Sequence, residues 1–235
     1  NTTGYDNVAV GRNALDANIG GHSNTALGES SLTSNTTGIR NVAVGQNALA
    51  VNLAGSENVA IGRGALDANT ASYNTAVGDS ALGANTTGAQ NTAVGYAAGQ
   101  GLTGASHFNV AIGDETMLAS GVKSYNTAVG SDAMRAITTG QQNVSLGYNA
   151  GSAITTGAGN ICIGHGATTV TSDRNYSITM GRNVASVGNY YFTFGVDASD
   201  HRVYNNFTSN ASWTRASDER IKKDISTNTD CGLNF

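Results

Sequence analysis

The chain has 235 residues with only 12% charged residues, 31 Gly, no Pro and a net charge of −4. This weakly acidic balance gives no basic surface of the kind that binds nucleic acid, so we expect no nucleic-acid partner. No apolar run approaches the roughly 20 residues of a membrane-spanning helix, so we also expect no membrane insertion.

A five-residue motif returns about every seventeen residues: Asn, then Val, Thr or Ile, a small residue, a large aliphatic residue, and Gly. Its ten clear copies begin and end at Asn7 and Gly11, Asn24 and Gly28, Asn41 and Gly45, Asn58 and Gly62, Asn74 and Gly78, Asn91 and Gly95, Asn109 and Gly113, Asn126 and Gly130, Asn143 and Gly147, and Asn160 and Gly164. Two weaker copies end at Gly181 and Gly195. A fixed short period predicts a solenoid in which each turn packs on its neighbours.

Each motif has the pattern of a short strand, as residues 75–77 illustrate. Thr75 and Val77 lie two residues apart and share one face, whereas Ala76 points to the other. Across the copies, the large position forms a ridge of aliphatic side chains, and the small position, which includes Cys162, forms a strip of methyl-sized groups. Neither position carries charge, so we expect both faces of the strand to be buried.

A second segment follows each motif, with a small residue and then Leu, as in Ala48-Leu49. Its pattern fits a second strand or a single helical turn, and the sequence does not decide between them. Several turns then contain Thr-Thr-Gly, as in Thr86-Thr87-Gly88. We expect the Gly of this turn, and the Gly of the motif, to adopt a positive φ.

The leading Asn of the motif has two interpretations. Its amide could form a ladder that faces a ligand, or it could hydrogen-bond the turn above and cap the backbone. We favour the structural interpretation.

One turn of about 17 residues carries only three or four apolar side chains, which is a thin core to offset the entropy of ordering it. The second segment of the chain can cover one face of the strand, and a partner must cover the other. We therefore predict an all-β, parallel β-solenoid over residues 1–195, with about twelve turns, that assembles with itself as a parallel homotrimer.

The period fails after Gly195. Residues 196–216 are rich in aromatic side chains and are predicted to form a neck or a capping layer. Residues 217–235 begin with a short helix signal, in which Ser217 or Asp218 is the N-cap and Ile221 and Ile225 share one face.

The Asn-x-Ala-(Val/Ile)-Gly repeats resemble the left-handed β-roll heads of trimeric autotransporter adhesins, which have a shorter period, and the repeats of viral and bacteriophage tail fibres. The segment Ser217-Asp218-Glu219-Arg220-Ile221-Lys222 resembles the start of the intramolecular chaperone domain of phage tailspikes, endosialidases and tail fibres. That resemblance implies self-cleavage at the bond between Ser217 and Asp218, with Ser217 as nucleophile and Lys222 as base.

These resemblances lead us to expect a structural and receptor-binding segment of a trimeric phage tail fibre, located in the virion. Its expected partners are further copies of itself, other fibre or baseplate proteins, and a glycan or protein receptor on the host surface. The alternative is the head of a bacterial trimeric autotransporter adhesin at the cell surface. Apart from single-turnover self-cleavage we expect no enzymatic activity, because the acidic residues form no recurring pair of the kind that glycosidases need.

We expect no cofactor and no metal site, since the four His and two Cys are dispersed. Aromatic and His side chains gather in the loops before the motifs, where they could stack on a sugar or cover a groove between subunits; the second use is favoured. They are Tyr5, His22, Tyr73, His107, Phe108, Tyr125 and Tyr176.

Overall fold

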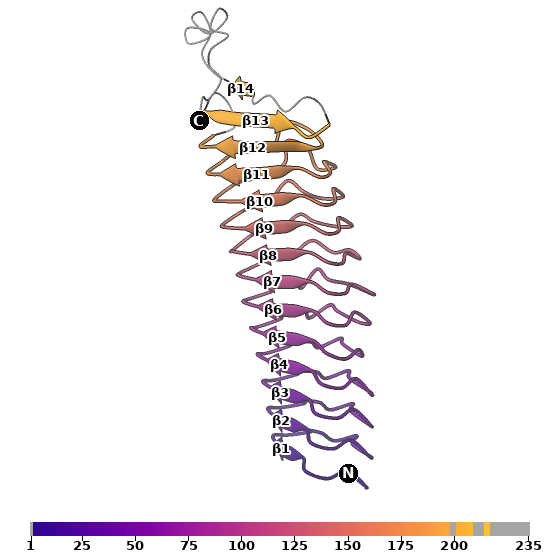
Figure 1. Cartoon of the computed structure of the whole chain (residues 1–235). Coiled ribbons are helices and arrows are strands. Elements are labelled where there is room, and N and C mark those ends of the chain that lie inside the picture. Colours follow the sequence, from indigo (N-terminus) through magenta and orange to yellow (C-terminus); the bar gives the residue numbers. More distant parts are fainter. Residues whose placement is uncertain (1, 198–200, 209–213, 217–235) are drawn as a thin grey trace, which may run out of the picture.

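The computed structural model describes residues 2–197, 201–208 and 214–216. Over these residues the chain is all-β and forms one sheet of fourteen strands in sequence order (Figure 1). The strands are β1 (Val8–Val10), β2 (Thr25–Leu27), β3 (Val42–Val44), β4 (Val59–Ile61), β5 (Thr75–Val77), β6 (Thr92–Val94), β7 (Val110–Ile112), β8 (Thr127–Val129), β9 (Val144–Leu146), β10 (Ile161–Ile163), β11 (Ile178–Gly181), β12 (Tyr191–Gly195), β13 (Arg202–Asn206) and β14 (Thr214–Ala216).

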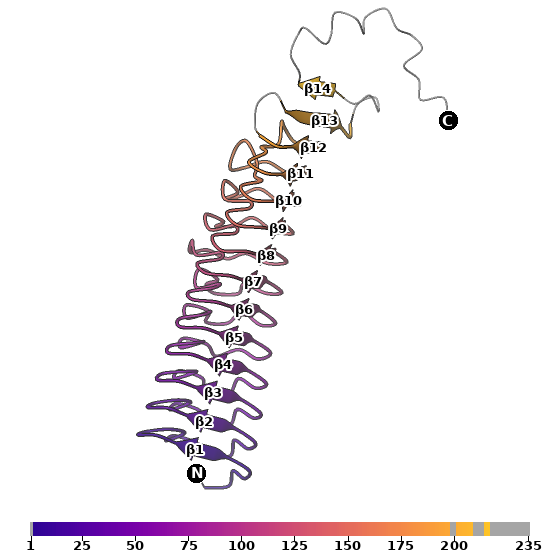
Figure 2. The same cartoon turned by 90° about the vertical axis from the view of Figure 1, so that its left-hand side faces the viewer.

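The predicted parallel solenoid is confirmed. Strands β1 to β12 pair in parallel with equivalent motif residues side by side, as Val42 pairs with Val59 and Ala43 with Ala60. They therefore delimit about eleven turns, each of which we call a rung and number by its strand. Figure 2 shows the strands along one side of the stack, with the rest of each rung extending behind them. The ridge side of each strand consequently forms one long, narrow face.

The small residue of each motif points into the rung. Ala43, Ala60 and Ala76 are fully buried, as is Cys162. They pack against the Leu of the second segment, such as Leu49, in one continuous core. The strip of methyl-sized groups thus faces the chain's own second segment, and the interior of a rung is only one Ala and one Leu deep.

The second segment is neither a strand nor a helical turn, although its sequence pattern fits either. In rung 3 it is a series of turns whose backbone bonds both neighbouring rungs. Asn47 N–H donates to Glu29 O at 3.0 Å in the rung below, and Leu49 N–H donates to Ala65 O at 3.0 Å in the rung above. The hydrogen bonds between rungs therefore continue around the turn beyond the strands.

Left-handed backbone conformations make these turns. The fourth residue after the motif Gly has a positive φ in rungs 1 to 9, for example 52° at Leu49 and 50° at Met134. This position holds only Leu, Met or Gly: it is Leu15, Leu32, Leu49, Leu66, Leu82, Gly99, Met117, Met134 and Gly151. Branching at Cβ makes a positive φ especially unfavourable, which explains why Ile and Val are absent there.

The motif Gly has the positive φ that the sequence predicted, for example 129° at Gly45. A Cβ atom at Gly45 would also lie 2.5 Å from Gly62 O in the next rung. The Gly of the Thr-Thr-Gly turn is different, because Gly88 has no positive φ and that prediction is wrong. Gly88 is required for space, since a Cβ there would be 2.0 Å from Ser106 O.

The parallel stack ends at β12. Strand β13 pairs with β12 in the antiparallel direction, with Thr193 opposite Tyr204, and β14 continues the antiparallel pairing. Within the described part of residues 196–216, this reversal covers the edge of β12. The sequence-predicted helix in residues 217–235 lies outside the described residues.

We expect Leu49→Ile to destabilise the protein by about 1–2 kcal/mol, because a β-branched side chain must then adopt a left-handed conformation. Leu49→Met is the matched control, since Met already occupies this position at Met117 and Met134. Urea unfolding, monitored by circular dichroism, should give midpoints that decrease from the wild type to the Met variant and then to the Ile variant. Equal midpoints for the two variants would contradict the backbone explanation.

Candidate functional site

The leading Asn side chains form a buried amide ladder inside the stack. Asn41 Oδ1 accepts from Asn58 N–H at 3.0 Å and from Asn58 Nδ2 at 3.1 Å, and Asn41 Nδ2 donates to Gly55 O at 2.9 Å. Similar bonds recur in other rungs, and the members from the second rung onward are fully buried: Asn24, Asn41, Asn58, Asn74, Asn91, Asn109, Asn126, Asn143 and Asn160. The ladder holds rungs together and presents no amide to a ligand.

A second Asn ladder was missed in the sequence. It begins at Asn18 and contains Asn35, whose Nδ2 donates to Asn18 Oδ1 at 3.0 Å and to Gly38 O at 3.1 Å. The detectable signal is an Asn eleven residues after the motif Asn in the first five rungs: Asn18, Asn35, Asn52, Asn69 and Asn85. From the sixth rung, apolar residues such as Leu102 and Ile137 take most of these positions.

Lys123 fills the interior where this second ladder is missing. It stands three residues before Asn126, a position that is Gly in most rungs, and its side chain is fully buried. Lys123 Nζ donates to Gly101 O at 3.0 Å, to Ile137 O at 2.9 Å and to Ala119 O. Burial lowers the pKa of Lys123 to about 8. No pattern in the sequence indicated that this Lys would point inward.

The surface on the opposite side of the strands is an apolar ridge, which we define as the outward residues at the second and fourth motif positions of β1 to β12. No charged residue stands at these positions, and their polar members are Thr25, Thr75, Thr92 and Thr127. Its large members at the fourth position are Val10, Leu27, Val44, Ile61, Val77, Val94, Ile112, Val129, Leu146, Ile163, Met180 and Phe194. Several are unusually exposed for aliphatic residues in the isolated chain, including Leu27 at 46% and Leu146 at 49%. The face that the sequence predicted to need a partner is therefore open to solvent.

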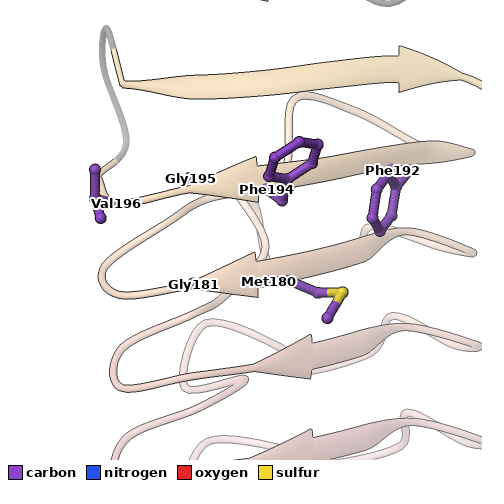
Figure 3. Close-up of a pocket in the computed structure, with 6 residues that line it drawn as sticks. All are labelled: Met180, Gly181, Phe192, Phe194, Gly195 and Val196. Carbon is purple, nitrogen blue, oxygen red and sulfur yellow. The ribbon is translucent and has the colours of Figure 1, made fainter.

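The ridge widens into an apolar hollow at its C-terminal end (Figure 3). The side chains of Met180, Phe192 and Phe194 project there from β11 and β12, and Gly181, Gly195 and Val196 complete the lining. Because Met180 and Phe194 continue the same column as Ile163, the hollow belongs to the ridge and is not a separate site.

Charged and aromatic residues flank the ridge at both ends of the strands. Before the strands, Arg40 Nη1 lies 2.6 Å from Glu57 Oε1, and after the strands Arg63 Nη2 lies 2.8 Å from Asp79 Oδ2. Aromatic rings stack between rungs on the same corner as Arg40. The ring centroids of Phe108 and Tyr125 are 5.1 Å apart, and those of Tyr176 and Tyr190 are 5.4 Å apart. Tyr5 stacks on His22 near the other end.

The remaining predicted residues form no additional centre in the described part of the chain. Ser217, Asp218 and Lys222 lie outside the described residues. Burial raises the pKa of the Cys162 thiol to about 12, which keeps it protonated and unreactive at neutral pH. Within residues 2–197, 201–208 and 214–216, no three His, Cys, Asp or Glu side chains gather where they could hold a metal ion. The same residues include no helix able to cross a membrane.

Comparisons of the chain with models of protein families, with curated proteins and with solved structures found no match.

We expect Asn41→Ala to lower the free energy of unfolding by about 2 kcal/mol, because Asn58 N–H then loses its buried acceptor and Gly55 O keeps only the amide of Asn52 as a side-chain donor. Gln46→Ala, on the exposed surface of the same rung, is the matched control and should change stability little. Thermal unfolding by calorimetry measures both. Equal stabilities would show that the amide ladder contributes nothing.

Lys123 predicts a pH dependence of stability. Its pKa is about 8 in the folded chain, against an ordinary value of 10.5 for a solvated Lys, so between these values the unfolded chain binds more protons. The free energy of unfolding should therefore rise by about 3 kcal/mol from pH 8 to pH 10.5 through this group. The difference in stability between wild type and Lys123→Met, measured by urea unfolding across this range, isolates the contribution. A difference that stays constant with pH would contradict it.

Proposed function

We propose that this chain is a rod segment of an extracellular homotrimeric attachment fibre of the phage tail-fibre kind. In this assembly, three chains stand parallel and pack their apolar ridges around a common axis. The observation that carries the proposal is the exposure of the ridge along the whole stack, from Val10 to Phe194. A continuous apolar surface on a soluble protein marks an interaction site.

The shape of the ridge supports a second copy of the same chain as its partner. The ridge repeats at the spacing of the rungs, so an aligned copy meets it with an equivalent apolar residue at every level. A parallel arrangement also places the hollow of Met180, Phe192 and Phe194 against its own equivalents. An antiparallel copy would instead place these large side chains against Val8 and Val10.

The thin interior of each rung also supports self-association, because a single chain buries little apolar area when it folds. A rung buries only a few small apolar side chains and one Leu between its two walls, as Ala43, Ala48 and Leu49 illustrate, and leaves Val44 partly in contact with water. When the ridge packs against another copy, each strand buries additional apolar area, and the chain need not be longer. The number of copies, three, is supported by the resemblance of the repeats to β-roll heads and tail fibres.

Within the proposed trimer, the stacked aromatic pairs at the starts of the strands cover the groove between neighbouring subunits. Phe108, Tyr125 and Tyr176 are each about half exposed, at 45%, 56% and 51%. Aromatic rings on a rigid corner suit such contacts because they bury a large area with little loss of side-chain freedom.

A single charge on the ridge tests the self-association. Ile112→Lys places an ammonium group at the centre of the proposed interface in each copy, so the trimer should weaken by at least about tenfold. Thr87→Lys introduces the same charge on an exposed turn and should leave assembly unchanged. Sedimentation velocity of the full chain gives the oligomeric state. A wild type that sediments as a monomer, or an unaffected Ile112→Lys trimer, would overturn the proposal.

A further inference from the structure

We propose that the two corners flanking the ridge pair between neighbouring subunits and set their vertical alignment. This inference rests on the self-association proposed above. We call the residues immediately before the motif Asn the entry column, and the residues immediately after the motif Gly the exit column. From rung 1 to rung 5 the entry column is Asp6, Ser23, Arg40, Glu57 and Tyr73, and the exit column is Arg12, Glu29, Gln46, Arg63 and Asp79.

The direction of the strands brings these two columns together. Each strand runs across the long axis of the stack, with the entry column at its start and the exit column at its end (Figure 1). In a closed ring of three ridges, every subunit contacts the next one through different surfaces. The entry column of one chain therefore faces the exit column of its neighbour.

The ridge alone specifies vertical alignment poorly. Its residues are nearly interchangeable between rungs, since Val44, Ile61 and Val77 occupy equivalent positions. A slip by one rung would still place aliphatic side chains against aliphatic side chains, and only the ends would lose contact. An additional feature that differs from rung to rung is needed to select one alignment.

The charges of the columns supply that difference. With the subunits level, Asp6 faces the neighbouring subunit's Arg12, and Glu57 faces the neighbouring subunit's Arg63. Both pairs have opposite signs. Arg40 meets the uncharged Gln46 of the neighbour. Every charged pair at equal level is therefore favourable.

A slip of one rung can place each entry residue opposite the neighbour's exit residue one rung above. The charges that face each other then change from opposite to like. Asp6 would then face Glu29, Arg40 would face Arg63, and Glu57 would face Asp79. These three pairs are all of like charge. A slip in the other direction retains one opposite pair, Arg40 with Glu29. A constant slip accumulates over the three contacts and does not close a ring, but opposite slips at two of the contacts do close, and the charges disfavour that arrangement.

Ion pairs within each chain hold these charges at successive levels. Arg40 and Glu57 pair along the entry column at 2.6 Å, and Arg63 and Asp79 pair along the exit column at 2.8 Å. In the level arrangement Glu57 of one chain and Arg63 of the next join the two pairs into a network of four alternating charges. Charge patterns of this kind contribute more to alignment and specificity than to affinity.

Disulfide formation can report the alignment without disturbing the charges. The reporters lie in rungs 8 to 10, where the chosen column residues carry no formal charge. Gln142→Cys in the entry column is combined in turn with Tyr148→Cys at the same level, Ser131→Cys one rung below, or His165→Cys one rung above. The background carries Cys162→Ser, which Ser145 shows to fit the same interior position, and Cys231→Ser.

After oxidation of the assembled full chain, we expect the pair Gln142→Cys and Tyr148→Cys to give a covalent trimer on a non-reducing gel. The two other pairs should remain largely monomeric on the gel. Exchanging the charges with Arg40→Glu and Glu57→Arg keeps their pairing within the chain but reverses their signs toward the neighbour. In that background the same-level product should fall at least several-fold.

Two results would overturn the alignment while leaving the trimer intact. One is a trimer by sedimentation whose same-level pair forms no product, or whose shifted pairs form it instead. The other is a same-level product that the charge exchange leaves unchanged. A wild-type chain that sediments as a monomer would instead reject the self-association on which the inference rests.

Discussion

The hydrogen bonding between rungs is the constraint on which the rest of the structure depends. Because these bonds continue beyond the strands, each rung must present nearly the same backbone path to the rungs above and below. That path requires a motif Gly with a strongly positive φ, as at Gly45, and left-handed residues in the second segment, as at Leu49. It also leaves polar groups inside, which the Asn ladders satisfy. The sequence repeats because every rung follows this one backbone path.

The same constraint separates the interior from the surface. Inside, the rung is so narrow that only small residues such as Ala43 fit opposite Leu49, so the interior offers little room for a ligand. Outside, the large motif residues form the ridge, and many of them are exposed in the described part of the chain. The part of the molecule that varies from rung to rung lies at the two ends of each strand, in charges such as Glu57 and Arg63 and in rings such as Phe108. The features able to distinguish partners are therefore on the corners.

The strands, the inward Ala and the φ of the motif Gly could be predicted from the sequence, because period-two alternation and the conformational freedom of Gly act locally. The second segment could not. Leu49 has no intrinsic preference for a left-handed backbone, and only bonds to two other rungs hold it there. Gly88 was misassigned for a related reason, since the obstacle to a Cβ is the carbonyl of Ser106 in the next rung. The side chain of Lys123 fills interior space where the second Asn ladder is missing. Because other residues of the rungs create that space, no local pattern in the sequence reveals it.

Among the rungs that begin at the ten clear motif copies, two depart from the seventeen-residue period, and the stack absorbs both. The rung that begins at Asn58 has 16 residues and the one that begins at Asn91 has 18, yet β4 to β5 and β6 to β7 pair in the same register as the others. A turn can therefore gain or lose a residue without shifting the strands on which the ridge is built. Whole rungs are interchangeable in the same sense, so duplication or deletion of a rung would change the length of the rod and keep its cross-section. Length is thus a property that evolution can adjust in steps of one rung, independently of the side chains that form the ridge.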